Sequence, residues 1–239
     1  MFECPELVSI SVPLLSFRMT KIDCQAVLFD LDGVLVDSTP AVARVWTIWA
    51  NKHGFDPDET VRKAHGRPSL ATIRELLPGA DHEAENALVE RMEIEDVSDI
   101  IPLPGAAELL ASLAADRWTV VTSCTRTLAL VRLRVAGLPV PRKMVTSTDI
   151  VHGKPHPEPY LKGAEALRVG PEECVVFEDA PAGIRSGKAA NTRVIAFQTT
   201  ESDELLRQAG ADWIVKDASA VRVAATNGKS GISLLLHGS

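Results

Sequence analysis

The second half of the chain alternates short apolar runs with helical patterns, and this alternation is the strongest constraint on the fold. The apolar runs lie at 118–122, 143–146, 174–177, 193–197 and 212–215. Helical patterns between them predict right-handed βαβ units, which build a parallel sheet covered on both faces. A further buried strand is predicted at 27–29. We therefore expect an α/β fold with a three-layer αβα core.

The segment between the first strand and the alternating half contains helical patterns only. Helices are predicted at about 38–54, 57–64, 69–77 and 82–98. Residues 38–102 are therefore expected to form a small all-helical cap inserted into the core. Residues 23–37 and 103–239 are expected to form the core itself, which is Rossmann-like. Residues 1–22 are expected to be an N-terminal tail without a chemical role.

The composition is that of a globular protein, and it excludes two classes of partner. The formal charge of −7 lacks the basic footprint of a nucleic-acid-binding or membrane-surface protein. No apolar run approaches the roughly 18 residues that span a bilayer. The four cysteines show no paired or metal-binding spacing, which favours a reducing cytoplasm. We expect a monomer or a weak homodimer.

Two acidic pairs stand where predicted strands end. Asp30 and Asp32 share one side of an extended chain, and Gly33 then allows a tight turn. Neighbouring carboxylates repel each other unless a cation or a shared proton relieves them. The first pair alone could equally be a solvated strand end, but the pair 178–179 follows a second strand. Strand-end carboxylates, together with a phosphate oxygen, suit Mg²⁺.

Two other polar segments follow predicted strands. Thr122, Ser123 and Cys124 open a strand-to-helix turn whose hydroxyls and N–H groups could bind phosphate, although such residues also cap helices. A packed thiol is the simpler interpretation of the Cys124 side chain. Lys154 lies in a proline-rich loop with few accessible conformations, which suits a fixed anion better than loose solvation.

These segments together carry a family resemblance. Asp30-x-Asp32-Gly33, Thr122-Ser123, Lys154 and Glu178-Asp179, in this order, resemble the four motifs of the haloacid dehalogenase superfamily of phosphohydrolases. The resemblance covers about residues 24–217, and the helical insert is similar to the cap of that superfamily. The stretches 65–68, 101–106, 121–126 and 153–160 resemble the branch that dephosphorylates small sugar and polyol phosphates, including glycerol-phosphate and deoxysugar-phosphate phosphatases.

The resemblance implies a phosphatase mechanism for a small phosphorylated metabolite. Asp30 would attack phosphorus and form an aspartyl-phosphate, and Asp32 would protonate the leaving group and later activate water. Thr122 would bind a phosphate oxygen, and Lys154 would pair with both Asp30 and the phosphate. The other residues expected at the phosphate are Gly33, Ser123 and Cys124.

The resemblance also implies the metal ligands. Mg²⁺ would be held by Asp30, the backbone carbonyl of Asp32 and Asp179, with Glu178 alongside. Glu178 departs from the pair of aspartates that is common in the superfamily, and a slight shift in metal geometry is the expected consequence.

The cap is expected to select the substrate. His65 and Arg67 lie on a glycine-containing turn between two predicted cap helices, and they are our candidates for substrate recognition. A solvated polar turn is the alternative interpretation. Two other functions remain open: a sugar phosphomutase with the same aspartyl-phosphate chemistry, and a binding module without catalysis.

Overall fold

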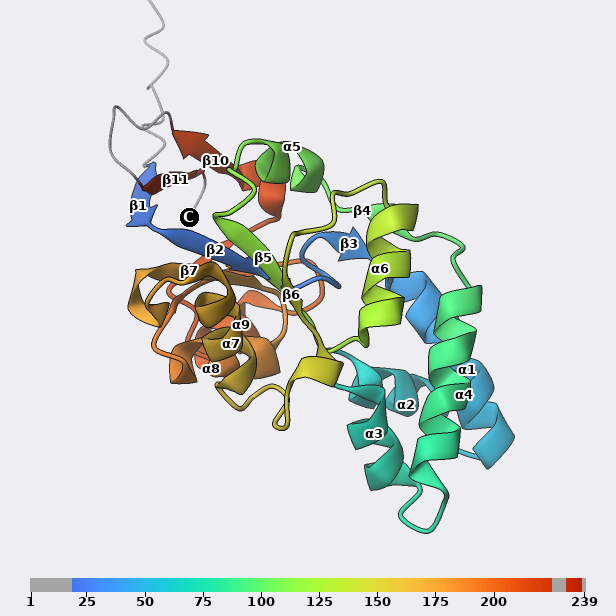
Figure 1. Ribbon diagram of the computed structural model, residues 1–239. Helices are drawn as coiled ribbons and strands as arrows, with labels where there is room; N and C mark the ends of the chain where they lie inside the picture. The colour runs from blue at the N-terminus through green and yellow to red at the C-terminus, as the bar shows by residue number, and fades with distance from the viewer. Residues whose placement is uncertain (1–18, 225–230, 238–239) are drawn as a thin grey trace, which may run out of the picture.

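A sheet of six parallel strands forms the centre of the computed structural model, which describes residues 19–224 and 231–237 (Figure 1). The strand order in this described part is β6-β5-β2-β7-β8-β9. The strands are β2 (Ala26–Phe29), β5 (Trp118–Val121), β6 (Met144–Val145), β7 (Cys174–Glu178), β8 (Arg193–Phe197) and β9 (Trp213–Val215). In register, Val27 lies opposite Trp118 on one side and Val175 on the other. β2 is therefore flanked by β5 and β7, the strands that carry two of the three other polar motifs.

Helices cover both faces of this sheet, as the alternation predicts. They are α5 (Ala106–Ala111), α6 (Arg126–Val135), α7 (Glu158–Leu167), α8 (Pro181–Ala189) and α9 (Asp203–Gln208), with short 3₁₀ turns at Ser147–Asp149, Pro171–Glu173 and Ala218–Ala220. Successive strand residues point to opposite faces. Leu28 packs in the cluster with residues of α7, α8 and α9, whereas Phe29 packs in the cluster with residues of α5 and α6. The predicted α/β core with a parallel sheet is confirmed.

A second, antiparallel sheet adds to the face that α5 and α6 cover. It is formed by β1 (Thr20–Cys24), β11 (Ile232–Leu236) and β10 (Val221–Ala224), in this order. Residues 20–22, assigned above to the tail, instead belong to β1, and residues 1–18 lie outside the described part. The strands after residue 215 were not predicted. Ile22, Leu234 and Leu236 are buried in the same cluster as Phe29, which ties this sheet to the core.

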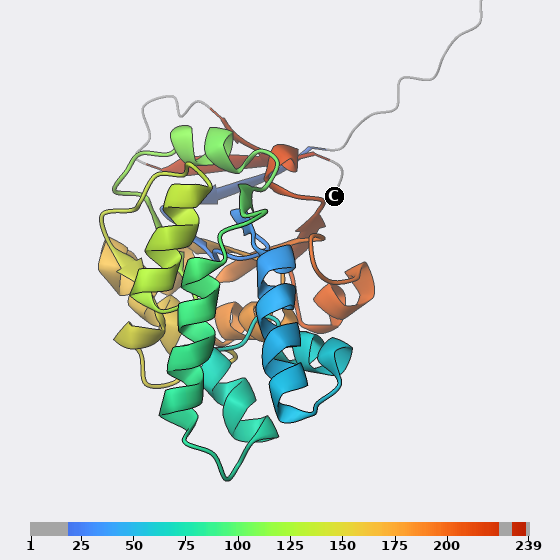
Figure 2. The same cartoon turned by 90° about the vertical axis from the view of Figure 1, so that its right-hand side faces the viewer.

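The insert folds as an all-helical cap. Its described helices are α1 (Thr39–His53), α2 (Pro57–Ala64), α3 (Ser69–Leu76) and α4 (His82–Glu95), and Figure 2 shows α1 and α4 side by side. Trp46, Trp49 and Ile73 are buried in a separate apolar cluster. α4 ends three residues before the predicted 98. The chain passes between core and cap through a two-residue antiparallel pair, β3 (Val36–Asp37) and β4 (Ile101–Pro102).

Two further features of the described residues concern membrane-spanning helices and cysteines. None of their helices combines the length and apolarity required to cross a membrane. Cys24, Cys124 and Cys174 are free thiols, and Cys4 lies outside the described part.

Candidate active site

The predicted site residues meet at the carboxyl end of the central sheet, beneath the cap. Asp30 follows β2, Thr122 follows β5, and Glu178 ends β7. The carboxyl ends of parallel strands share one edge of a sheet, and ligands of such folds bind there. A cavity of about 500 Å³ opens at this edge. Its lining includes most of the predicted site residues, namely Asp30, Asp32, Gly33, His65, Arg67, Thr122, Ser123, Cys124 and Asp179.

Lys154 and Glu178 form the buried base of the site. The Lys154 Nζ lies 2.8 Å from Asp30 Oδ1 and 2.6 Å from Glu178 Oε1. Burial by itself lowers the pKa of Lys154, but the two carboxylates raise it overall and keep the ammonium charged. This lysine therefore neutralises part of the acidic cluster.

Glu178 is held by four hydrogen bonds, which is the full acceptor capacity of a carboxylate. Its Oε1 accepts from Lys154 Nζ and from the Tyr160 hydroxyl at 2.7 Å. Its Oε2 accepts from the backbone N–H groups of Asp179 at 3.0 Å and Ala180 at 3.2 Å. The carboxylate thus orients the lysine and the turn that carries Asp179.

The acidic cluster fits a divalent cation. Carboxylate oxygens of Asp30, Glu178 and Asp179 all lie within 4.8 Å of one another. Burial raises the pKa of Asp30 well above its ordinary value, and the neighbouring Glu178 and Asp179 raise it further, while Lys154 opposes them. Asp30 Oδ1 is buried beside the Lys154 ammonium. A bound cation would add a second positive partner and favour the ionised carboxylate.

Asp32 lies at the cavity wall and is bound by donors on both oxygens. Oδ1 accepts from the Ser38 hydroxyl at 2.6 Å, and Oδ2 accepts from Arg132 Nη1 at 2.5 Å. The Cys124 thiol donates to the same Oδ2 at 3.1 Å. The side chain of Asp32 remains 26% exposed, so a bound substrate can reach it.

Arg132 and Glu93 were missed by the sequence reasoning. Arg132 lies on α6 and Glu93 on the cap helix α4, and their side chains meet at 3.3 Å. One signal was present in the sequence. Arg132 follows Leu128 by four residues, so it occupies the apolar face of α6, where an unpaired charge would be costly.

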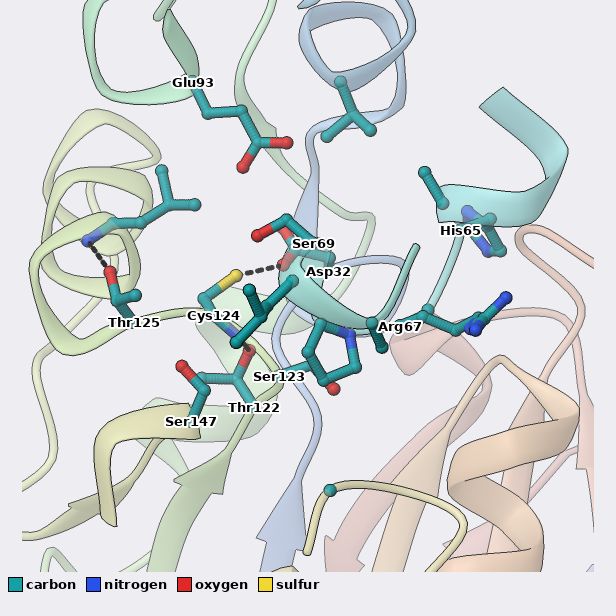
Figure 3. A pocket seen from close by; sticks show the side chains of 18 of the residues that line it. Asp32, His65, Arg67, Ser69, Glu93, Thr122, Ser123, Cys124, Thr125 and Ser147 are labelled. Carbon is teal, nitrogen blue, oxygen red and sulfur yellow. Dashed lines mark hydrogen bonds between the residues drawn. The ribbon is translucent and has the colours of Figure 1, made fainter. Parts of the chain in front are cut away.

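The turn after β5 has the form expected of a phosphate site. Thr122 is buried, and its hydroxyl oxygen accepts a hydrogen bond from the Cys124 N–H at 3.1 Å. Thr125 caps the N-terminus of α6, which follows directly. Burial raises the pKa of the Cys124 thiol well above its ordinary value, so this thiol stays protonated and packs beside Asp32 (Figure 3).

The two predicted cap residues lie on the other side of the cavity from Glu93 (Figure 3). His65 Nε2 lies 3.7 Å from Asp179 Oδ2, which places His65 beside the acidic cluster. The Arg67 guanidinium is paired with Glu75 of the cap at 2.9 Å and points away from Asp32. The geometry thus brings His65 to the acidic end of the cavity and leaves Arg67 at its rim.

Comparisons with known proteins agree with this geometry. The family model described as a haloacid dehalogenase-like hydrolase matches residues 24–191. Hexitol phosphatase A of Escherichia coli is 46% identical over 72% of this chain and 82% of its own. Glycerol-1-phosphate phosphohydrolase 2 of Saccharomyces cerevisiae is 35% identical over 90% of this chain and 91% of its own. The crystal structure of a hydrolase from Pseudomonas syringae has the same fold, with a TM-score of 0.71, 24% identity and coverage of 82% of this chain and 94% of its own.

Proposed function

Because this chain belongs to the haloacid dehalogenase-like hydrolase family, we propose that it is a Mg²⁺-dependent phosphatase of small sugar or polyol phosphates. The observation that carries the proposal is the buried Asp30–Lys154–Glu178 cluster, which lies beneath the cavity that also exposes Asp32. The two named relatives hydrolyse a hexitol phosphate and glycerol 1-phosphate, according to their names, and this supports the substrate class.

In the first chemical step, Asp30 is the nucleophile and Asp32 is the acid. A carboxylate oxygen of Asp30 forms a bond to phosphorus while the bond from phosphorus to the alkyl oxygen breaks. Asp32 gives its proton to the departing alkoxide. Thr122, the Ser123 N–H and the neighbouring Gly33 and Cys124 surround the phosphate oxygens, and Lys154 balances their charge.

The second step releases inorganic phosphate. Asp32, now ionised, takes a proton from water, and the water oxygen attacks the phosphorus of the aspartyl-phosphate. The bond between phosphorus and Asp30 breaks and restores the free carboxylate. Each aspartate thus ends the cycle in the protonation state in which it began.

The cation would be held by Asp30, Asp179 and the backbone carbonyl of Asp32. Mg²⁺ prefers such oxygen ligands together with a substrate phosphate, and when bound it neutralises charge that develops on the transferring group. We assign Glu178 a supporting place beside the ion, because its oxygens already accept four hydrogen bonds.

The cap side of the cavity suits a hydroxylated leaving group. Polar side chains from the cap, Ser69, Asn86 and Glu90, share this lining with the apolar Val42 and Trp46. Hydroxyl groups of a polyol can form hydrogen bonds with the polar side chains, while its C–H groups contact the apolar ones. His65 and Arg67 remain our candidates for contacts to the substrate.

The nucleophile assignment is tested by Asp30→Asn. The variant keeps the shape of the side chain but loses the nucleophilic oxygen, so we expect it to fold normally and to release no phosphate. Phosphate release is measured with phosphorylated polyols, hexoses, deoxyhexoses and glycolate, with and without Mg²⁺, and folding by circular dichroism. Substantial phosphatase activity in Asp30→Asn would refute the assignment.

The same assay separates the remaining functions. A phosphomutase would accumulate an isomeric sugar phosphate instead of free phosphate, and a binding module would produce neither.

The free thiols of the described residues support our proposal of a cytoplasmic location. The proposed assembly is a monomer or a weak homodimer, without nucleic acid or membrane partners.

A further inference from the structure

Arg132 is a charged residue at a core position that the proposed mechanism does not use. It lies on the buried face of α6, next to Leu128 and Leu133, and is 4% exposed. Its Nη1 contacts Asp32 Oδ2 at 2.5 Å and the Cys124 sulfur at 2.8 Å, and its Nη2 contacts Glu93 Oε2 at 3.3 Å. A single guanidinium therefore joins the acid/base candidate to the cap.

A buried guanidinium requires charged partners, because removing a charge from water is strongly unfavourable unless partners compensate. Asp32 and Glu93 are those partners. Burial lowers the pKa of Arg132, but these carboxylates raise it overall, so the guanidinium stays charged. Burial in turn raises the pKa of Glu93, and the arginine opposes that shift. The charges of all three groups compensate one another because Arg132 meets both Asp32 of the core and Glu93 of the cap.

The contacts of Asp32 define how its carboxyl group is oriented. A guanidinium has donors and no acceptor, so Oδ2 must act as the acceptor toward Arg132. Oδ1 is shared with the Ser38 hydroxyl, which can either donate or accept. Oδ1 is therefore the oxygen that can carry a proton to the substrate, while Oδ2 stays fixed.

We propose that Arg132 is a positioning residue that holds the Asp32 carboxyl in the orientation for proton transfer, and that Glu93 of the cap anchors the other side of its guanidinium. This inference rests on the proposed function, in which Asp32 is the acid and base. It also links the acid and base to the cap, because Glu93 belongs to the cap helix α4 and contacts the same guanidinium.

The test compares two leaving groups in Arg132→Met. An alkyl phosphate such as glycerol 1-phosphate releases a strongly basic alkoxide that needs a proton, whereas 4-nitrophenyl phosphate releases a weak base that does not. We expect kcat/KM for the alkyl phosphate to fall about 100-fold, the lower range of an acid–base contribution. The pre-steady-state burst of nitrophenolate is expected to keep its rate, and Arg132→Lys to recover part of the alkyl activity.

Glu93→Gln and Arg44→Met complete the comparison. Glu93→Gln should show the same selective loss to a smaller degree, and it tests the inference if Arg132→Met does not fold. Arg44 pairs with Asp96 of the cap at 2.8 Å without touching Asp32, so Arg44→Met should leave the ratio of the two activities unchanged.

Three results would overturn the inference. Equal losses on both substrates, or a raised KM with unchanged kcat, would make Arg132 a structural or substrate-binding residue. An unchanged ratio of the two activities in Glu93→Gln would do the same. Wild-type protein that hydrolyses neither phosphate, whatever the divalent cation, would instead refute the proposed function.

Discussion

Gly33 lies where a side chain would collide with the proposed metal site. Its φ is +75°, and a Cβ atom there would lie 2.1 Å from Asp179 Oδ2 and 3.0 Å from the Thr200 methyl carbon. A contact as short as 2.1 Å requires Asp179 to move. At the scale of single residues, the absence of a side chain at this position therefore preserves the spacing of the acidic cluster.

We predict that Gly33→Ala loses activity and needs more Mg²⁺ for half-maximal turnover, because Asp179 is displaced. Gly54→Ala is the matched control. Gly54 has a φ of +74° but nothing within 4 Å of an added Cβ. Both variants should lose about 1 kcal/mol of unfolding free energy from the left-handed backbone. Mg²⁺ titrations of activity check the prediction, and equal Mg²⁺ requirements would contradict it.

At the scale of elements, the loop before α7 is the segment that presents Lys154. The Glu158 carboxylate, at the start of α7, accepts hydrogen bonds from the N–H groups of Val151 at 3.0 Å and His152 at 2.8 Å. These two bonds hold the pKa of Glu158 down at about 2, with help from Lys162. The carboxylate thus closes the loop that carries the lysine.

We predict that Glu158→Gln lowers the melting temperature at neutral pH. The difference in melting temperature between the variant and the wild type, called the gap below, should narrow in acid. A carboxyl whose pKa is lowered by folding stabilises the native state above its unfolded pKa of about 4.3. That stabilisation is lost as the pH falls toward 2. Thermal unfolding between pH 7 and pH 3 measures the gap. Glu165→Gln, exposed on the same helix, controls for the charge, and a gap that widens in acid would contradict the prediction.

At the scale of the whole molecule, the antiparallel sheet lies at the end of the core that is remote from the cap helices (Figure 1). Leu234 of β11 is fully buried in the cluster that includes Phe29 of the central strand. The sheet therefore contributes to the stability of the core, and none of its described residues lines the cavity.

We predict that Leu234→Ala lowers the unfolding free energy by about 2–5 kcal/mol, because it leaves a void in the shared core. Its kcat/KM should equal that of the wild type at temperatures where it stays folded. Leu235→Ala, at the half-buried neighbouring position, should cost less. Urea denaturation gives the stabilities, and a change in kcat/KM without a change in stability would disprove the assignment.

Patterns in the sequence are enough to predict the core fold and the grouping of the motif residues. Apolar runs and helical periods depend on near neighbours, so the helix 57–64 and the strand 193–197 appear where they were predicted. The rule that parallel strands share a carboxyl end then brought Asp30 and Asp179 together without knowledge of any contact.

The pairing of charges becomes visible only in the folded molecule. Arg132 and Asp32 are 100 residues apart, and nothing local indicates that α6 turns this arginine toward β2. The same holds for Arg67, whose partner is Glu75, and for β1, which pairs with a strand more than 200 residues later. Periodicity shows which face of an element is buried, but the docking of one element on another selects its partner.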